Sequence, residues 1–220
     1  AIVGESGSGK SVTALTLLQL LPKQTSISGE ILFSPDGQQQ QDLLKLSGKS
    51  VSNIRGNKIA MIFQEPMTSL NPVYTCGDQV MEVLLRHQKI SKHEAREETI
   101  RLFEQVALPD PTGMLKRFPH QLSGGQKQRV MIAMAMSCRP ALLIADEPTT
   151  ALDVRVQKNI LNLIKELQQQ NNTAVLLITH DLALVSDVAD EVIVMYKGQI
   201  VEQGDAQTIL SNPQHNYTKA

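Results

Sequence analysis

The chain has 220 residues, of which 41% are apolar, 20% charged and 3% aromatic, and its formal net charge is −1. Its length predicts one large domain or two small ones. The balanced charge and the scarcity of aromatic residues argue against a nucleic-acid-binding surface, so no nucleic-acid partner is expected. Two distant cysteines, Cys76 and Cys138, argue against a disulfide framework and a cysteine zinc site.

The first residues predict a strand, a glycine loop and a buried helix in direct succession. Ala1-Ile2-Val3 leads into a loop at residues 4–11, and an apolar segment at 12–21 follows and ends at Pro22. Because the chain opens in the middle of a strand pattern, we expect further residues upstream.

The segment up to Gln64 predicts two more strands. Weak alternation at residues 28–33 indicates the first, and the apolar run 58–63 indicates the second, which ends at Gln64. The polar run 38–41 beside Asp36-Gly37 predicts a loop.

Residues 66–121 lack strand patterns and predict a helical insertion. Helix is expected at 77–88, and Ser91 with Glu94 forms the sequence of a capping box. The helix that this box opens has one apolar face, made of Ala95, Thr99, Leu102, Phe103 and Val106.

The second half alternates apolar strands with helices. The expected strands are 142–145, which ends at Asp146-Glu147, and 175–178, which ends at Thr179-His180, and a hairpin is expected at 192–201. Helices are expected from Ser123 to Cys138 and around an apolar face made of Val156, Ile160, Leu163, Ile164 and Leu167. The predicted fold class is α/β, with a mostly parallel sheet covered by helices on both faces, an antiparallel β part and the helical insertion.

Residues 4–11 match the phosphate-loop pattern G-x-x-x-x-G-K-S. Lys10 would reach the outer phosphates of a nucleotide, Ser11 would ligate Mg²⁺, and the backbone of the loop would surround the phosphates. The alternative is a glycine-rich turn that caps a helix. The nucleotide-binding residues predicted here are Gly4, Glu5, Ser6, Gly7, Ser8, Gly9, Lys10 and Ser11.

Polar residues at strand ends complete a predicted catalytic site, since ligands gather at the carboxyl ends of parallel strands. Asp146 would hold Mg²⁺ through water, and Glu147 would accept a proton from an attacking water. Gln64 would ligate Mg²⁺ or orient water, and His180 would donate to a terminal phosphate. The alternatives are structural roles, with Asp146 and Glu147 capping the turn at Pro148.

The sequence Ser123-Gly124-Gly125-Gln126 predicts a second anion site at a helix N-terminus, with exposed amides and a favourable dipole. The alternative is an ordinary helix cap. One phosphate loop does not need this site within its own chain, but a facing copy of the chain could use it.

These motifs, in this order, resemble the ATP-binding cassette (ABC) ATPases. Residues 4–11 look like Walker A, Gln64 like the Q-loop, Leu122 to Gln126 like the family signature, Leu142 to Glu147 like Walker B, 151–153 like the D-loop and His180 like the switch histidine. Residues 63–72 and 145–154 are similar to the ATPases of dipeptide, oligopeptide and nickel importers. The tail 212–218 resembles the His-Pro-Tyr-Thr motif of that subfamily, with Asn216 in place of proline.

The resemblance implies an ATPase, with ATP and Mg²⁺, that powers a bacterial importer of peptides or similar solutes. Two cassettes would meet head to tail, with Asp153 and the Ser123 region of one facing the Walker A loop of the other. ATP binding would close the dimer, and hydrolysis would reopen it. The helical insertion would contact the membrane permease, an extracytoplasmic solute-binding protein would act indirectly, and the chain would lie peripherally on the cytoplasmic face of the inner membrane.

The resemblance also implies a four-part division of the chain. Residues 1–65 and 122–205 would form the nucleotide-binding core, 66–121 the helical subdomain and 206–220 the start of a C-terminal extension.

Other classes fit less well. DNA-repair and chromosome-maintenance ATPases share the signature but insert long coiled coils, and no sustained heptad lies between Gln64 and Ser123. A translation-factor cassette would need a tandem second cassette. The GTPase motif N-K-x-D is not met, because Asn57-Lys58-Ile59 is followed by Ala60. The presence of Glu147 and His180 argues against a regulatory module without turnover.

Overall fold

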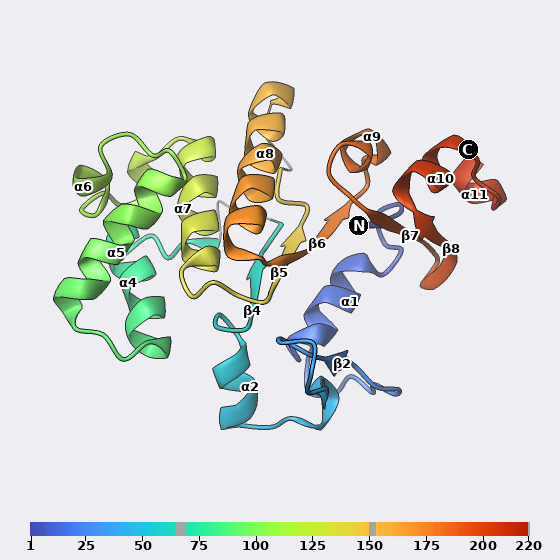
Figure 1. Ribbon diagram of the computed structural model, residues 1–220, viewed down its shortest axis with the longest axis horizontal. Helices are drawn as coiled ribbons and strands as arrows, with labels where there is room; N and C mark the ends of the chain where they lie inside the picture. The colour runs from blue at the N-terminus through green and yellow to red at the C-terminus, as the bar shows by residue number, and fades with distance from the viewer. Residues whose placement is uncertain (65–68, 150–152, 220) are drawn as a thin grey trace. The chain divides into compact units, whose positions relative to one another are not determined.

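The computed structural model describes residues 1–64, 69–149 and 153–219 (Figure 1). The chain divides into two compact units. Unit 1 comprises Ala1–Ser52, Ile144–Glu147 and Val175–Ala220, and unit 2 comprises Asn53–Leu143 and Pro148–Ala174. The division of the chain into four parts by sequence stays a prediction.

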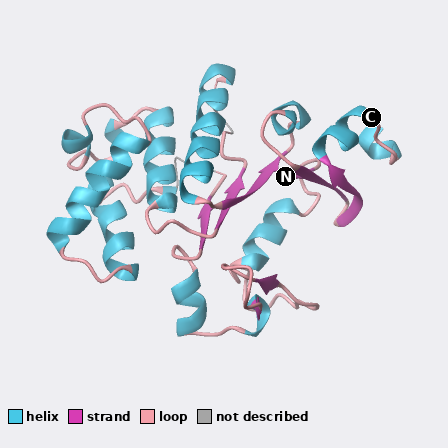
Figure 2. Ribbon diagram, in the orientation of Figure 1, coloured by secondary structure: helices cyan, strands magenta, loops and turns pink. Residues whose placement is uncertain are grey.

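The sheet of unit 1 is built around the short first strand, β1 (Ile2–Val3). β1 lies between β6 (Ala174–Thr179) and β7 (Glu191–Tyr196) and is parallel to both, with Ile2 opposite Ile178 and Ile193. The order continues as β5-β6-β1-β7-β8, where β5 is Leu142–Asp146 and β8 is Gln199–Asp205 (Figure 2). β7 and β8 form the predicted antiparallel hairpin. The predicted fold class, a mostly parallel sheet with helices and an antiparallel part, is confirmed.

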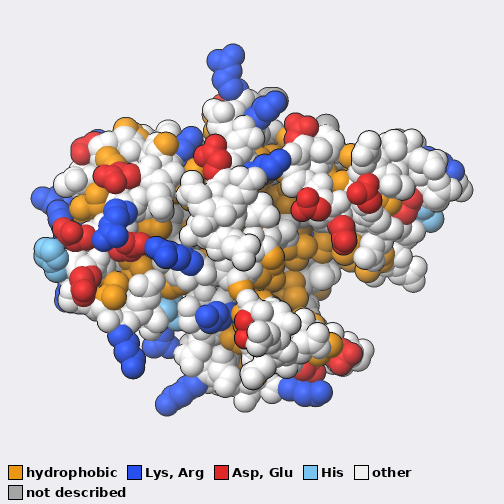
Figure 3. Space-filling model, viewed as in Figure 1, with side chains coloured by type: hydrophobic (Ala, Val, Ile, Leu, Met, Phe, Trp, Pro, Cys, Tyr) orange, Lys and Arg blue, Asp and Glu red, His pale blue; other side chains and the backbone are white. Residues whose placement is uncertain are grey.

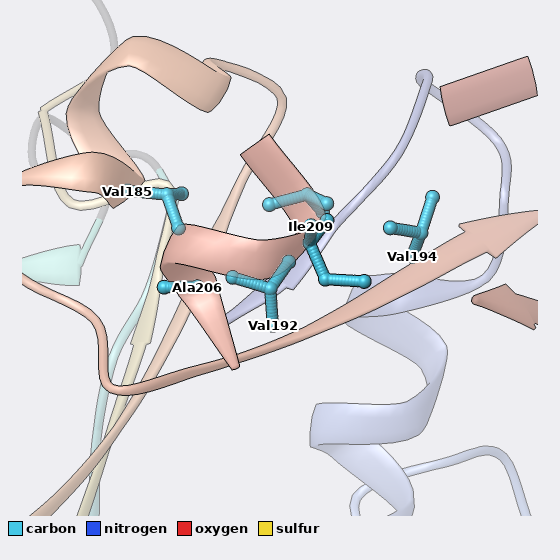
Figure 4. Packing of buried hydrophobic residues seen from close by; sticks show 6 residues of the cluster. Val185, Val192, Val194, Ala206 and Ile209 are labelled. Atoms are coloured by element: carbon cyan, nitrogen blue, oxygen red, sulfur yellow. The ribbon is translucent and has the colours of Figure 1, made fainter. Parts of the chain in front are cut away.

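A cluster of small apolar side chains packs one end of this sheet against two short helices, α9 (Leu182–Ser186) and α10 (Ala206–Ser211). Val192 and Val194 point to the same face of β7 because side chains alternate along a strand. Figure 4 shows them with Val185, Ala206 and Ile209, and Val3 of β1 completes the buried cluster. The C-terminal helix α11 (Asn216–Lys219) adds Tyr217 to its edge.

Four local predictions for the first part of unit 1 were wrong in whole or in part. The helix α1 (Lys10–Leu17) ends before residue 21, because Gln19 takes a left-handed conformation (φ 49°) and its side-chain Nε2 donates to the carbonyls of Leu43 and Leu46. Val12 of this helix is 54% exposed, so the helix is not apolar and buried on all sides.

The strand expected at 28–33 shrinks to β2 (Leu32–Phe33), and Gln41, expected in a loop, lies in its antiparallel partner β3 (Gln41–Asp42). The cause is Asp42, whose carboxylate accepts hydrogen bonds from the Ile31 and Leu44 amides, both at 3.1 Å. This contact joins the two segments and begins the 3₁₀ turn Leu43–Lys45, which precedes α2 (Lys49–Ile54).

Unit 2 contains strand β4 (Ile59–Ile62), where the sequence predicts one. The Lys58 carbonyl accepts hydrogen bonds from the amides of Ala141 and Leu142 at 2.9 and 3.1 Å, which places β4 beside the start of β5. The remaining elements of this unit are helical: α4 (Cys76–His87), α5 (Lys92–Gln105), α6 (Pro111–Met114), the 3₁₀ turn Pro119–Gln121, α7 (Gly124–Met136) and α8 (Val154–Asn171). Over residues 69–121, which the structure describes, the expected helical insertion has no strand.

The capping box of α5 is present as predicted. Ser91 Oγ accepts from the Glu94 amide at 3.2 Å, and the Glu94 carboxylate accepts from the Ser91 amide at 2.7 Å. The predicted apolar face is buried, and the opposite face carries interspersed acidic and basic side chains, which Figure 3 shows on the helical part. Among the residues that the structure describes, no helix has the length and apolar composition needed to cross a bilayer.

The Ser91→Ala variant should lose about 1 kcal/mol of unfolding free energy, because the Glu94 amide loses its partner at the helix N-terminus. Urea unfolding of this variant beside Arg96→Ala, an exposed change within the same helix, measures the effect. Equal losses in the two variants would show that the cap contributes nothing.

Candidate functional site

The phosphate loop connects β1 to α1, and two glycines allow its shape. Gly9 caps α1 in a left-handed conformation (φ 102°) that side chains disfavour. A Cβ atom on Gly4 would lie 2.1 Å from the Met195 carbonyl oxygen, so this position has no room for a side chain. The loop therefore fits tightly against β7.

Lys10 is the first residue of α1, and its ammonium group points back into the loop. Nζ donates to the carbonyls of Gly4 at 2.7 Å and Glu5 at 2.9 Å. Burial lowers the pKa of Lys10, and the carboxylates of Glu147 and Asp146 oppose this shift. The loop thus holds a positive charge that its own carbonyls and nearby carboxylates stabilise.

The hydroxyl of Ser8 is an indication that the loop accommodates a ligand. Ser8 is 3% exposed, and among the described residues its Oγ has no hydrogen-bond partner. Buried polar atoms nearly always have partners, and exceptions call for an explanation. A buried donor hydroxyl in the same loop as the Lys10 ammonium fits a bound anion such as phosphate.

Ser11 and Asp146 place two oxygen ligands together. Ser11 Oγ donates to Asp146 Oδ1 at 3.1 Å, and Asp146 is buried at the end of β5. Burial raises the pKa of Asp146, the Ser11 hydrogen bond and the charge of Lys10 counteract it, and the charge of Glu147 adds to it. A hydroxyl and a carboxylate form the oxygen donor set that Mg²⁺ prefers, so these residues fit that ion.

Glu147 and His180 form a pair at the ends of β5 and β6. Glu147 Oε1 lies 3.3 Å from His180 Nδ1, and the Glu147 side chain is 13% exposed against 62% for His180. Glu147 has a left-handed backbone (φ 45°), held by the hydrogen bond of its amide to the Ile178 carbonyl at 2.9 Å. Such strain in a residue other than glycine is typical of functional sites.

Unit 1 thus brings together, at the carboxyl ends of its parallel strands, the phosphate loop, Asp146, Glu147 and His180. The other predicted site residues lie in unit 2. Gln64 follows β4 and is exposed. Asp153 caps α8 and accepts from the Val156 amide at 3.0 Å. Residues 151 and 152 of the D-loop lie outside the described residues, as do residues 65–68 and 150 of the importer-like segments.

The signature segment forms a helix cap, which the sequence left open as the alternative, and its role as an anion site stays a prediction. Ser123 Oγ accepts from the Gln126 amide at 3.3 Å, and Gln126 Oε1 accepts from the Ser123 amide at 3.0 Å. A Cβ atom on Gly125 would lie 3.5 Å from Val156 Cγ1, so the N-termini of α7 and α8 are neighbours within unit 2. Gly124 is the first residue of α7 and is exposed.

Sequence reasoning missed the residues that support the loop from the C-terminal part of the chain. The Glu5 amide donates to Tyr217 Oη at 2.8 Å, and the Gly198 amide donates to the Ser8 carbonyl at 3.0 Å. The Tyr217 ring stacks on Tyr196 with centroids 4.4 Å apart. The tail motif at 212–218 was noticed, but nothing in its spacing indicates this contact.

Comparisons with known proteins identify relatives that are named as ATP-binding proteins of transporters. A family model described as ABC transporter matches residues 1–150. The glutathione import ATP-binding protein GsiA of Salmonella choleraesuis (strain SC-B67) is 54% identical over all of the chain, which spans 36% of that protein. The dipeptide transport ATP-binding protein DppD of Bacillus subtilis (strain 168) is 53% identical, and the chain spans 64% of it.

Two solved structures share the fold. The ATP-binding cassette MJ0796, in a dimeric post-hydrolysis state bound to ADP and Pi, superposes with a TM-score of 0.78 at 28% identity, covering 93% of this chain and 84% of that one. cbiO1 from Clostridium perfringens, part of the ABC transporter complex cbiONQ, superposes with a TM-score of 0.78 at 28% identity. The match covers 96% of this chain and 78% of cbiO1. With its family model matched over residues 1–150 and its phosphate loop in place, the chain belongs to the ABC transporter family.

Proposed function

We propose that this chain is the ATP-hydrolysing nucleotide-binding domain of an ABC importer for peptides or similar small solutes. One observation carries the proposal: the buried Lys10 and the half-buried Ser11 of the phosphate loop meet Asp146 and the Glu147–His180 pair at the carboxyl ends of the parallel strands. The relatives named for glutathione import and dipeptide transport support the class of solute.

The loop binds the triphosphate. Lys10 exchanges its hydrogen bonds to the Gly4 and Glu5 carbonyls for phosphate oxygens, and Ser8 supplies a further donor. The N-terminus of α1 adds its positive dipole end. Ser11 and Asp146 would hold Mg²⁺, with Gln64 as the further ligand that the sequence predicts, and the ion would supply positive charge to the phosphates.

Glu147 carries the chemistry of hydrolysis. Its carboxylate accepts a proton from the attacking water while the water oxygen bonds to the γ-phosphorus. The bond from the γ-phosphorus to the bridging oxygen breaks, and ADP leaves with that electron pair. His180 holds the Glu147 carboxylate through Nδ1 and presents its other ring nitrogen to the terminal phosphate, and Gln64 orients the water.

The second anion site acts on a partner. Ser123, Gly124, Gly125 and Gln126 of one copy, with Asp153, complete the ATP site on the loop of a second cassette. The dimeric cassette structure at 28% identity supports this arrangement. The segment 66–121 contacts separate membrane subunits, and an extracytoplasmic solute-binding protein acts through them. The chain lies peripherally on the cytoplasmic face of the inner membrane.

Glu147→Gln should reduce ATP turnover about a hundredfold or more while Mg-ATP still binds, because the proton acceptor is lost and the phosphate contacts remain. Phosphate release measures turnover, and scattering of the variant saturated with Mg-ATP should show a dimer. Glu104→Gln, an exposed change in α5, is the matched control. A wild-type rate in Glu147→Gln would remove Glu147 as the base.

Lys10→Ala should weaken Mg-ATP binding about ten- to a hundredfold, the value of charge-assisted hydrogen bonds to phosphate. Calorimetry measures the affinity, with the exposed Lys89→Ala as control. Unchanged affinity would take Lys10 out of the phosphate site.

Asp146→Asn should raise the unfolding midpoint at pH 7 without nucleotide, because burial raises the pKa of Asp146 and its ionised form therefore destabilises the fold. This gain in stability should vanish below about pH 4, the ordinary pKa of aspartate, because wild-type Asp146 is then protonated in both the folded and the unfolded state. It should grow as the pH rises from there through the raised pKa of the folded state.

Thermal unfolding across pH, beside the exposed Asp187→Asn, tests this, and the same variant should lose the Mg²⁺-dependent part of its ATP affinity. A variant less stable than the wild type at pH 7 would contradict the argument.

A further inference from the structure

We propose that Tyr217 is a positioning residue that fastens the C-terminal tail, residues 212–219, to the phosphate loop and thereby raises the affinity of the loop for nucleotide. The inference rests on the proposed function, since it assigns a support to the same loop. Its geometric basis is the hydrogen bond from the Glu5 amide to Tyr217 Oη at 2.8 Å, which joins residues 212 positions apart.

The Glu5 peptide is held on both sides. Its amide donates to Tyr217, and its carbonyl accepts from Lys10 Nζ at 2.9 Å and from the Ser8 amide at 3.2 Å. The two peptide groups that flank the Glu5 Cα therefore influence where Lys10 rests and how the turn to Ser8 closes. Both residues face the phosphates in the proposed function.

The tail itself is anchored on the hairpin. The Glu202 carboxylate of β8 accepts hydrogen bonds from the amides of Gln214 at 2.7 Å and His215 at 3.1 Å. The Tyr217 amide donates to His215 Nδ1 at 3.2 Å, which fixes the first turn of α11. The backbone around Tyr217 is thus anchored independently of the hydrogen bond between its hydroxyl and the loop.

The ring of Tyr217 is held as well. It stacks on Tyr196 with centroids 4.4 Å apart and planes 30° apart, and Lys197 Nζ lies 5.0 Å from the Tyr196 ring centroid. Tyr196 follows Met195, whose carbonyl lies against Gly4. The two tyrosines and the loop therefore share one support, the end of β7.

A loop that is fixed before its ligand arrives loses less conformational freedom on binding, and so binds more tightly. The coupling must also be reciprocal, so bound nucleotide should order the tail. Loss of the Tyr217 hydroxyl alone keeps the ring stack and removes only the contact with the loop.

The first test is Tyr217→Phe in the full chain, with Mg-ATP affinity measured by calorimetry and kcat and KM by phosphate release. We expect a two- to tenfold weaker affinity, the range for loss of one hydrogen bond, with kcat unchanged. Tyr196→Phe is the matched control, because it removes a hydroxyl from the other ring of the stack, and its hydroxyl has no hydrogen bond to any residue that the structure describes. Wild-type affinity in Tyr217→Phe, or a tighter one, would overturn the proposal.

The second test releases the tail by another route. Glu202→Ala removes the anchor of Gln214 and His215 and leaves the Tyr217 side chain in place. If the tail acts through Tyr217, the double variant Glu202→Ala/Tyr217→Phe should bind Mg-ATP no more weakly than whichever single variant has the lower affinity. If the losses of binding free energy in the two single variants simply add in the double variant, Glu202 and Tyr217 act independently. This result would contradict a tail that acts on the loop through Tyr217.

A third readout needs no nucleotide. Hydrogen exchange at the Glu5 amide, followed by NMR without ligand, should be faster in Tyr217→Phe than in the wild type or in Tyr196→Phe. Equal exchange would overturn the contact. A wild-type chain that failed to bind Mg-ATP would refute the proposed function instead, so the two failures are distinguishable. In the wild type, Mg-ATP should slow exchange in residues 214–219, and Tyr217→Phe should abolish that slowing.

Discussion

The buried ammonium group of Lys10 is the charge around which the phosphate loop of unit 1 is arranged. Lys10 is 5% exposed, and taking its charge out of water costs several kcal/mol. The Gly4 and Glu5 carbonyls and the carboxylates at the end of β5 compensate for that loss. One of these carboxylates, Asp146, is also the group that would hold a metal ion in the proposed site. The rest of unit 1 serves to keep these groups within reach of one another.

The site gathers several features that lower the stability of the fold. The Ser8 hydroxyl is buried without a partner among the described residues, Glu147 has a strained backbone, and the raised pKa of Asp146 reports an ionised form that burial disfavours. The valine cluster around β7 and α10 lies beside them and is apolar throughout. These strained and unpartnered groups of unit 1 thus lie in the site, and the residues of this cluster are apolar.

The sequence predicts those parts whose chemistry is local. The phosphate loop, the capping boxes at Ser91 and Ser123 and the strand ends at Asp146 and His180 depend on residues within a few positions of each other, and the structure contains them all. The end of α1 could not be predicted, because it depends on the contact of Gln19 with Leu43 and Leu46. Tyr217 was missed for the same reason, since its partner Glu5 lies almost a whole chain away and no periodicity encodes that meeting.

The strand order has a consequence for the newly made protein. β1 precedes both of its neighbours in the chain by a long interval, because β6 and β7 lie at residues 174–179 and 191–196. The phosphate loop is therefore made well before the two strands that flank β1, and Met195 must be present before its carbonyl can lie against Gly4. The native shape of the loop depends on contacts between segments far apart in the sequence, so it forms only after β7 has been made.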